Sequence, residues 1–210
     1  MASHSIVIRL ATAKDVHHIN AITQEIEASA KTKGTGLCKR SPQQLEQRIK
    51  EGHAVIALTA NNDWAGFCYI KAWDNAAFVS TCALVVSPAY RKSGVATQLK
   101  AEAFRLARTK YPAAKLFGLT TSLAVMKINT GLGFKPVTYS EITKAEGFWD
   151  ACKSCPNYDV LQRKNGATCL CTAMLFEAIG NETVPLSGHQ KFSSEQQHET
   201  RFQKKFAAVL

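Results

Sequence analysis

The sequence contains no long apolar run and no recognisable export signal. No apolar stretch approaches the ~20 residues that a membrane-spanning helix needs. The amino-terminal MASHSIVIRL has neither the cationic region nor the long apolar core of a signal peptide. These absences predict a cytoplasmic protein that does not associate with a membrane.

The sequence also lacks a nucleic-acid-binding motif, although its formal net charge is +10. Its Lys and Arg residues are dispersed, without blocks of like charge and without the alternation of aromatic and basic residues that follows a single strand. Dispersed positive charge attracts small anions. We therefore expect an anionic small-molecule ligand and no nucleic acid partner.

The seven cysteines are an odd number and no export signal accompanies them, which disfavours a disulfide framework. Four of them form two pairs, Cys152-x-x-Cys155 and Cys169-x-Cys171, on either side of Asn165-Gly166. Four thiolates suit a structural zinc site, whereas four buried thiols could equally pack this segment. Both interpretations stay open, and zinc would hold the segment in place without taking part in chemistry.

The apolar periodicity predicts a mixed α/β (α+β) fold with a largely antiparallel first half. Asn165-Gly166 also predicts a hairpin between residues 158–162 and 168–176. The expected helices begin next to Thr12, Ser41, Val95 and Ser122, and the expected strands are 6–10, 54–60, 66–73, 78–87, 115–121 and a strand from Phe134.

Residues 1–180 form one expected domain, with a Cys-rich insertion at about 142–171. Residues 181–210 are polar, and Ser194-Glu-Gln-Gln197 could cap a helix that carries Phe202 and Phe206. Such a helix would dock on the body or on a partner, and a mobile tail is the alternative. A homodimer is also left open.

The stretch VVSPAYRKSGVATQLKAEAFRLA (residues 85–107) joins a β-branched strand to an amphipathic helix through a short cationic turn. A glycine at a helix start allows close approach of a ligand to the backbone, and the unpaired N–H groups there attract anions. Arg91 and Lys92 strengthen that preference. The stretch is therefore typical of a phosphate-binding turn.

This order of elements resembles the GCN5-related N-acetyltransferase superfamily over residues 5–178. The superfamily signature [Q/R]-x-x-G-x-[G/A] corresponds to Arg91-Lys-Ser-Gly94-Val-Ala96, and its later Gly-Phe pair corresponds to Gly133-Phe134. The resemblance implies a central mixed sheet flanked by helices, with acyl-CoA as co-substrate and its pantetheine arm on free strand backbone. The implied cofactor-binding residues are Leu84, Val85, Val86, Arg91, Lys92, Ser93, Gly94, Val95, Ala96 and Thr97.

A closer resemblance is to the acyltransferase domain of N-acetylglutamate synthases. It is carried by residues 36–41, by Lys115-Leu-Phe-Gly-Leu-Thr-Thr121, by Gly133-Phe-Lys-Pro-Val137 and by Gln162-Arg163-Lys164. The resemblance implies transfer of an acetyl, or alternatively a succinyl, group to the α-amine of glutamate, the first step towards arginine. Lys39, Arg40 and Arg163 are the expected acceptor-binding residues, because guanidinium forks suit a dicarboxylate.

The general acid and base are not assigned by the resemblance. Ser80 stands where related enzymes often have a Glu, and Asn129 stands where many superfamily members have a Tyr. Ser80, Asn129 and Glu141 are therefore the candidate catalytic residues, with His53 as a further candidate base. We expect direct attack of the amine on the thioester in a ternary complex.

Two alternative functions stay open. The same fold could acylate another small amine or a protein amino-terminus, although paired acceptor arginines disfavour a cationic acceptor. A non-catalytic acyl-CoA sensor is the other alternative, since the usual Glu and Tyr are missing. A covalent acyl-enzyme on Cys82 is disfavoured, because no His is paired with it in the sequence.

Overall fold

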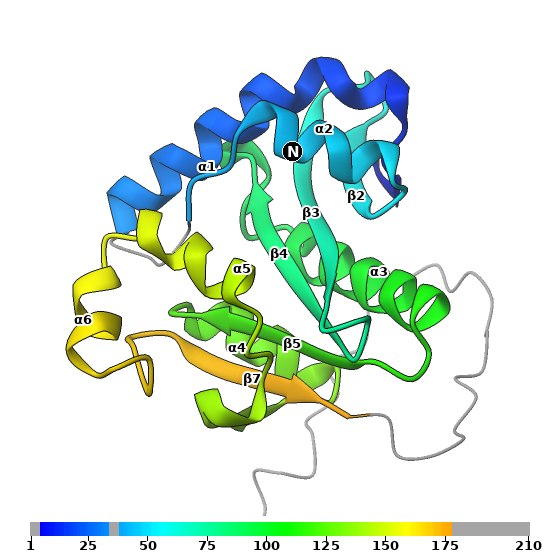
Figure 1. The fold of residues 1–210 in the computed structure, drawn as a ribbon. Helices are drawn as coiled ribbons and strands as arrows, with labels where there is room; N and C mark the ends of the chain where they lie inside the picture. Colours follow the sequence, from blue (N-terminus) through cyan, green and yellow to red (C-terminus); the bar gives the residue numbers. More distant parts are fainter. Residues whose placement is uncertain (1–4, 34–37, 178–210) are drawn as a thin grey trace, which may run out of the picture. The chain divides into compact units, whose positions relative to one another are not determined.

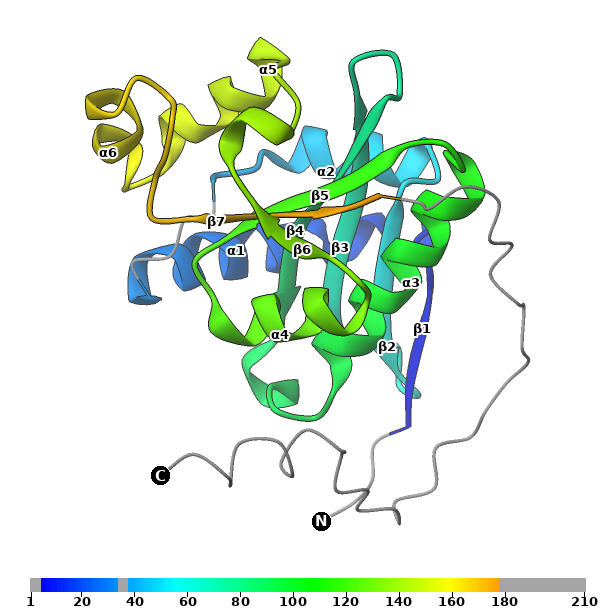
Figure 2. The same cartoon turned by 90° about the horizontal axis from the view of Figure 1, so that it is seen from below.

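Seven strands form one mixed sheet with helices on both faces (Figures 1 and 2), as the sequence predicts. The computed structural model describes residues 5–33 and 38–177. The strand order is β1-β2-β3-β4-β5-β7-β6, and only the pair β4 and β5 is parallel. The strands are β1 (Ile6–Leu10), β2 (Ala54–Thr59), β3 (Trp64–Trp73), β4 (Phe78–Val86), β5 (Lys115–Thr120), β6 (Lys135–Val137) and β7 (Thr172–Phe176).

The helices begin close to the capping residues that the sequence indicates. Ser41 accepts a hydrogen bond from the Gln44 amide at the start of α2, and Ser122 accepts one from the Val125 amide at the start of α4. The α-helices are α1 (Ile19–Lys33), α2 (Pro42–Lys50), α3 (Val95–Lys110), α4 (Leu123–Gly131), α5 (Glu146–Trp149) and α6 (Tyr158–Arg163), and the 3-10 helices are η1 (Ala13–His18), η2 (Pro88–Tyr90), η3 (Tyr139–Glu141) and η4 (Asp150–Ser154).

Two compact units divide the chain, Met1–Ile179 and Gly180–Leu210. The predicted helix with Phe202 and Phe206 and residues 34–37 lie outside the described residues. Within the described residues, no helix is long and apolar enough to cross a membrane.

Alternation along β3 assigns its side chains to two separate cores. Phe67 and Tyr69 pack with the buried residues of α1 and α2, whereas Cys68 and Ile70 pack with those of α3. Helices α1 and α2 therefore cover one face of the sheet and α3 covers the other. Gly66 allows α3 to lie close to β3, because any other residue there would place a Cβ only 2.7 Å from Leu99 Cδ1.

Strands β4 and β5 separate after a short parallel pairing. The pairing consists of Phe78 with Lys115, Val79 with Leu116 and Ser80 with Phe117. Both strands then continue, β4 to Val86 and β5 to Thr120. A register shift between β3 and β4 and a left-handed Ala83 (φ +51°) add a bulge at the same level. Among the described residues, the backbone of β4 beyond Ser80 therefore pairs with no strand on the side that faces β5.

The predicted hairpin around Asn165-Gly166 is wrong. Residues 158–163 form α6, and β7 instead pairs with β5 and β6. Asn165 and Gly166 have φ of +47° and +75°, and the Gly166 amide donates to the Leu161 carbonyl (2.9 Å). Left-handed residues close a helix as readily as they turn a hairpin, so the Asn-Gly pair is compatible with both.

The segment 142–171, which we call the inserted segment, carries α5, η4 and α6. Its apolar residues Ile142 and Leu161 pack with Phe117 of β5 and with Ala173 and Leu175 of β7. Figures 1 and 2 show α5 and α6 beside the β5 and β7 side of the sheet, away from α3. The segment therefore extends the face that α1 and α2 cover.

Candidate active site

The loop from Arg91 to Gly94 brings the amino-terminus of α3 to the end of β4. Lys92 and Gly94 have φ of +63° and +83°, and Gly94 is the N-cap of the helix. No described side chain caps this end, so the amides of the first turn lack both a capping and an intrahelical acceptor. Together with the helix dipole, these N–H groups favour an anion.

Arg91 holds this loop against the first helical layer. Its guanidinium forms an ion pair with Glu25 of α1 and donates to Ser29 Oγ (3.2 Å) and to the Val86 carbonyl (3.3 Å). Lys92 is exposed beside it. Arg91 thus adds positive charge to the loop and also fixes the position of the loop against α1.

A cavity of about 630 Å³, which we call the cofactor cavity, begins at this helix end. Its walls are β4 beyond the pairing with β5, the start of α3, the end of β5 and helix α4. Every predicted cofactor-binding residue except Ser93 lines it, and the Ser93 hydroxyl donates to the Tyr90 carbonyl (2.6 Å). The cavity therefore joins an anion-binding helix end to unpaired strand backbone.

The two most deeply buried polar residues in the walls of the cofactor cavity are Lys100 and Asn129. Lys100 of α3 donates a hydrogen bond to Thr81 Oγ1, and burial lowers the pKa of its ammonium to about 8. Asn129 is fully buried, and its Oδ1 atom has no hydrogen-bond partner among the described residues. An unsatisfied amide in a cavity wall is expected where a ligand supplies the missing partner.

A second cavity of about 420 Å³, which we call the acceptor cavity, lies between α2, β3, β4 and the inserted segment. Tyr69, Lys71 and Trp73 line it, and alternation places them on the face of β3 that is opposite to α3. The two cavities share the lining residues Thr81, Ala83, Gly118 and Leu119. The two cavities therefore meet where β4 and β5 separate. At this junction, a ligand in the cofactor cavity and a ligand in the acceptor cavity would contact each other from opposite faces of the sheet.

Arg40 forms part of the wall of the acceptor cavity. Its Nε donates to the Tyr69 hydroxyl (2.7 Å), and its Nη1 donates to the Lys39 carbonyl (2.8 Å). Burial raises the pKa of the Tyr69 phenol, which therefore stays neutral at physiological pH. These bonds hold a permanently charged guanidinium in one orientation.

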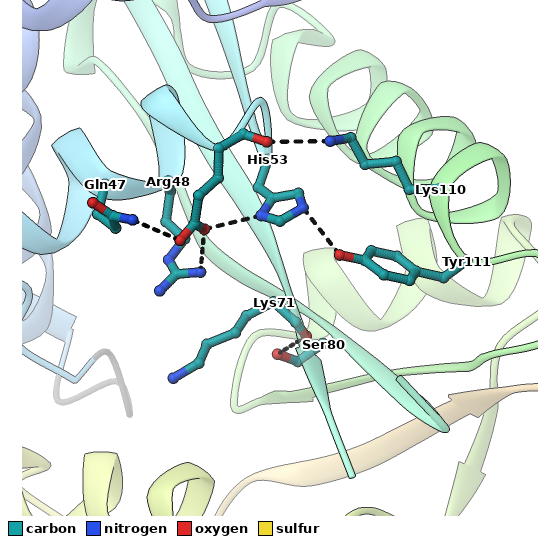
Figure 3. Close-up of polar contacts among 8 residues, drawn as sticks. Gln47, Arg48, His53, Lys71, Ser80, Lys110 and Tyr111 are labelled. Atoms are coloured by element: carbon teal, nitrogen blue, oxygen red, sulfur yellow. Dashed lines mark hydrogen bonds and ion pairs between the residues drawn. The ribbon is translucent and has the colours of Figure 1, made fainter. Parts of the chain in front are cut away.

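Arg48 and Lys71 bring two more cations to the acceptor cavity, and Figure 3 shows their side chains on the same side of β3. Arg48 Nη1 pairs with Glu51 Oε2 (2.5 Å). The Lys71 ammonium lies 3.9 Å from the centre of the Trp73 ring. Burial, followed by the positive charge of Arg48, lowers the pKa of Lys71. Three cations therefore line this cavity, and of these three only Arg48 forms an ion pair with a carboxylate of the described residues.

Ser80 and Cys82 lie side by side on β4 in the acceptor cavity. Their Oγ and Sγ atoms are 3.1 Å apart, and Ser80 Oγ also accepts a hydrogen bond from Trp73 Nε1 (2.8 Å). Ser80 is 1% exposed. The Ser80 hydroxyl therefore lies in the wall of the acceptor cavity, where it contacts both Trp73 and Cys82.

Several predicted site residues line neither cavity. Glu141 caps η3 by accepting from the Thr138 amide (2.7 Å). His53 lies 3.0 Å from both Glu51 Oε2 and the Tyr111 hydroxyl (Figure 3). The structure gives these two groups local structural partners.

The remaining two predicted acceptor-binding residues are also outside the cavities. Lys39 is exposed, with its ammonium 3.7 Å from Glu27. Arg163 is exposed on α6, where it pairs with Asp159 (2.7 Å). Of the three residues predicted to bind the acceptor, the structure places only Arg40 in the acceptor cavity.

The structure does not support the predicted zinc site. Within residues 5–33 and 38–177, no group of His, Cys, Asp or Glu is arranged to hold a metal ion. Cys155 Sγ accepts from the Asn157 amide (3.4 Å), and Cys169 Sγ donates to the Asn157 carbonyl (3.5 Å). The two cysteine pairs nevertheless lie near each other, since Asn157 forms hydrogen bonds with both Cys155 and Cys169. All four cysteines line the acceptor cavity, but they are not arranged to hold a metal ion.

Sequence reasoning missed Arg48, Tyr69, Lys71 and Lys100. The alternation in Phe67-Cys-Tyr-Ile-Lys-Ala-Trp73 carries a usable signal, because it places Tyr69 and Lys71 on one face of β3. No comparable local signal exists for Lys100, whose burial depends on the strands beneath α3.

The sequence pattern of the Acetyltransferase (GNAT) family matches residues 21–127, slightly more than half of the chain. No curated protein sequence matches the chain.

Solved structures share the fold at low sequence identity. N-acetylglutamate synthase from Neisseria gonorrhoeae, complexed with coenzyme A and N-acetyl-glutamate, has a TM-score of 0.58 and 22% identity, covering 84% of this chain and 36% of that one. Rv2747 from Mycobacterium tuberculosis, in complex with CoA and a second ligand, has a TM-score of 0.58 and 18% identity, covering 82% and 99%. yncA from Salmonella typhimurium, with acetyl-CoA, has a TM-score of 0.55 and 15% identity, covering 90% and 99%. The chain thus spans about a third of the gonococcal synthase.

Proposed function

Since the chain belongs to the acetyltransferase (GNAT) family, we propose that it transfers an acyl group from CoA to the α-amine of glutamate or a similar acidic amino acid. The observation that carries the proposal is the cationic acceptor cavity, which meets the cofactor cavity where β4 and β5 separate. The product would be an N-acylglutamate, the first intermediate towards arginine.

The charge of the acceptor cavity argues for an acidic acceptor. Arg40, Arg48 and Lys71 line it, and Asp150 is the only carboxylate among its described lining residues. Asp150 is itself paired with Lys153 (2.7 Å). Like charges in a partly buried space repel one another, and a bound dicarboxylate relieves that repulsion. A cationic acceptor such as a polyamine would increase it.

The fixed guanidinium of Arg40 suits one carboxylate of such an acceptor. Its hydrogen bonds to Tyr69 and Lys39 set its plane before a ligand arrives, which lowers the entropy cost of binding. Lys71 and Arg48 are then available to the second carboxylate from the same side of β3. Glutamate fits this arrangement, because one of its carboxylates would bind Arg40, the other would bind Lys71 and Arg48, and its amine would remain free to react.

The fold also favours direct transfer in a ternary complex. The amides at the start of α3 would bind the diphosphate of CoA, and the unpaired backbone of β4 would bind its pantetheine arm. The thioester would then lie at the junction of the two cavities, and the amine would approach from the acceptor cavity. Much of the rate would come from this alignment, and free strand N–H groups would polarise the thioester carbonyl.

The amine must be neutral when it attacks. We propose that its proton leaves to solvent through the acceptor cavity, where Ser80 is the member of the predicted catalytic set that lies in the wall. Glu141 lines neither cavity. The acyl group would be acetyl or succinyl, and both donors enter the test below.

The proposal is tested by measuring CoA release with acetyl-CoA and succinyl-CoA. The acceptors compared are glutamate, glutamine, lysine, a polyamine and a peptide amino-terminus. We expect turnover with glutamate and none with the polyamine. Turnover with a cationic amine alone would refute the acidic acceptor. Tight CoA binding without turnover on any amine would instead indicate a sensor.

A pair of arginine variants sharpens this test. Arg40→Gln should raise the KM for glutamate about 10- to 100-fold, because that is the effect of losing one hydrogen bond to a charged group. The dissociation constant of CoA should stay unchanged. The control is Arg163→Gln, because Arg163 is exposed on α6 and outside both cavities. An Arg163→Gln variant that loses glutamate binding while Arg40→Gln keeps it would reverse the assignment.

A further inference from the structure

Lys100 is a buried cation without a carboxylate partner in the described part of the chain. It lies on α3, is 4% exposed and lines the cofactor cavity. Its ammonium donates a hydrogen bond to Thr81 Oγ1 and lies 5.8 Å from the centre of the Phe134 ring. No ion pair within 4.0 Å joins it to an Asp or Glu of residues 5–33 and 38–177.

Such a residue is costly for the fold. Burying an ammonium without a counter-charge is strongly unfavourable, whereas a methionine or leucine at the same place would stabilise the contact between α3 and the sheet. The neighbours of Lys100 on α3, Leu99 and Ala103, are apolar and fully buried. The stability of the fold therefore does not explain the lysine.

Lys100 lies beside the junction of the two cavities, where the thioester would break in the proposed transfer. Its partner Thr81 lines both cavities, as does Gly118 on the opposite strand. The Cβ that Gly118 lacks would lie 3.5 Å from Thr81 Oγ1, so this point stays open. Among the described residues, the two cavities share lining residues only at this junction.

The two sides of the junction have different roles. The acceptor amine arrives on the face of α1 and α2, whereas Thr81 and Lys100 lie on the face that α3 covers. The leaving sulfur belongs to the carrier in the cofactor cavity. Lys100 is thus on the side from which the thiol departs.

We propose that Lys100 is the catalytic acid that protonates the CoA sulfur as the carbon–sulfur bond breaks. The assignment rests on the acyl transfer proposed above. The amine nitrogen forms a bond to the acyl carbon, the carbon–sulfur electron pair goes to sulfur, and a proton passes from Lys100 Nζ to that sulfur. The proton that the new amide nitrogen releases reaches solvent, and neutral Lys100 takes a proton back from solvent.

The surroundings of Lys100 leave it without another anion. From β3 it faces Cys68, and burial raises the pKa of that thiol to about 12. From β4 it faces Thr81, while the Cys82 thiol lies on the opposite face of β4. Phe134 lies on a further side, and Asn129 of α4 and Gly118 of β5 in the same cavity are uncharged. The lowered pKa of Lys100, about 8, is close to the value of about 8.5 for an ordinary thiol, which favours proton exchange between them.

The first test measures the pKa of the CoA thiol while CoA is bound to the full chain. The ultraviolet absorbance of the thiolate is titrated, and the complex with desulfo-CoA is subtracted to remove the protein cysteines. In the wild type the thiol pKa should be lower than in Lys100→Met by about one unit or more, as expected for an opposite charge within about 6 Å. Equal values in the two proteins would overturn the assignment.

This design separates the two proposals. If CoA does not bind the wild type at all, the proposed function fails, and the role of Lys100 fails with it. If CoA binds and glutamate is acylated but the thiol pKa does not depend on Lys100, only the role of Lys100 fails.

Kinetics supply the second test. Lys100→Met and Lys100→Gln should lower kcat by about 100-fold with little change in the KM for the acceptor, a typical loss for a general acid. The decline of kcat as pH rises through about 8 should disappear in both variants. Wild-type kcat with an unchanged alkaline decline would contradict the proposal.

Folding of the variants is not expected to be limiting. Because the pKa of Lys100 is lowered in the folded state, the buried lysine destabilises the wild type below pH 8, and this penalty fades between pH 8 and the ordinary value of 10.5. Lys100→Met should therefore unfold at the same or a higher denaturant concentration at pH 7. A variant that is folded by this measure and keeps full kcat overturns the proposal.

Discussion

Asp15 is a buried carboxylate that ties the first strand to the helix that follows it. Its two oxygens accept hydrogen bonds from Arg9 Nη1 (2.7 Å) and Nη2 (2.8 Å), and Oδ2 also accepts from the Thr12 amide (2.7 Å). The bonds from Arg9 lower the pKa of Asp15 to about 2. At 1% exposure, the carboxylate depends on these donors in place of water.

We predict that Asp15→Asn lowers the free energy of unfolding by about 1–3 kcal/mol at pH 7, since one neutral amide cannot satisfy the same donors. The folded pKa lies below the ordinary value of 3.8, so the stabilisation is present above pH 3.8 and is lost as pH falls towards 2. Urea unfolding at several pH values measures both effects. A difference between wild type and variant that grows on acidification would be inconsistent with this account.

Cys82 lies on β4 in the wall of the acceptor cavity, beside Ser80. Its sulfur contacts the Ser80 hydroxyl (3.1 Å), and no described hydrogen bond joins it to a histidine. A nucleophilic cysteine needs a partner that generates the thiolate. The geometry therefore agrees with direct transfer.

We predict that Cys82→Ala retains most of the acyl-transfer activity with glutamate. The measurement is kcat/KM alongside a thermal melt. A loss beyond about 100-fold in a folded variant would indicate a covalent acyl-cysteine.

At the scale of elements, the start of α3 combines a left-handed turn with a helix that has no capping side chain. Gly94 has φ +83°, a region in which a residue with a Cβ is strained. Gly66 lets α3 lie close to β3, so the helix end is fixed relative to the gap between β4 and β5. Strand separation and helix position together produce the cofactor cavity.

We predict that Gly94→Ala weakens CoA binding by about 5- to 10-fold, because about 1 kcal/mol of left-handed strain distorts the turn. Gly131→Ala in α4 is the matched control, since a Cβ there meets no atom within 4 Å. Titration calorimetry with CoA compares the two. Equal affinity for both variants would show that the turn does not bind the diphosphate.

The inserted segment shows where local signals mislead. Asn165-Gly166 indicates a left-handed pair correctly, and both residues do have positive φ. Whether that pair turns a hairpin or ends a helix is decided by tertiary packing, since Leu161 of α6 is buried in the same apolar cluster as Tyr139 and Phe117. Of the two interpretations that the sequence leaves open for the four cysteines, the zinc site is the one that the described residues do not support.

At the scale of the whole molecule, both cavities are built before residue 178. Their linings draw on α2, β3, β4, β5, the start of α3, α4 and the inserted segment. The unit Met1–Ile179 contains all of these elements.

We predict that a chain ending at Ile179 binds CoA with the affinity of the full chain. Affinity for both chains is measured by calorimetry at low and moderate salt. Because the net charge of the full chain is +10, binding of the polyanion should weaken as salt rises. Loss of CoA binding on truncation would assign residues 180–210 a part in the cofactor site.

The sequence by itself determined what depends on neighbouring residues. Caps at Ser41 and Ser122, the glycine turn at Gly94 and the apolar stripe of α3 are set by interactions within a few residues, and so the elements and the phosphate-binding turn could be predicted.

Only the tertiary structure decided which side chains meet. Arg40 reaches Tyr69 across 29 positions and Lys100 reaches Thr81 across 19, and no local rule encodes such contacts. The separation of β4 and β5 is likewise a property of the assembled sheet, since it depends on the bulge opposite β3. The acceptor cavity, its positive charge and the position of Lys100 exist only because long-range packing brings these segments together.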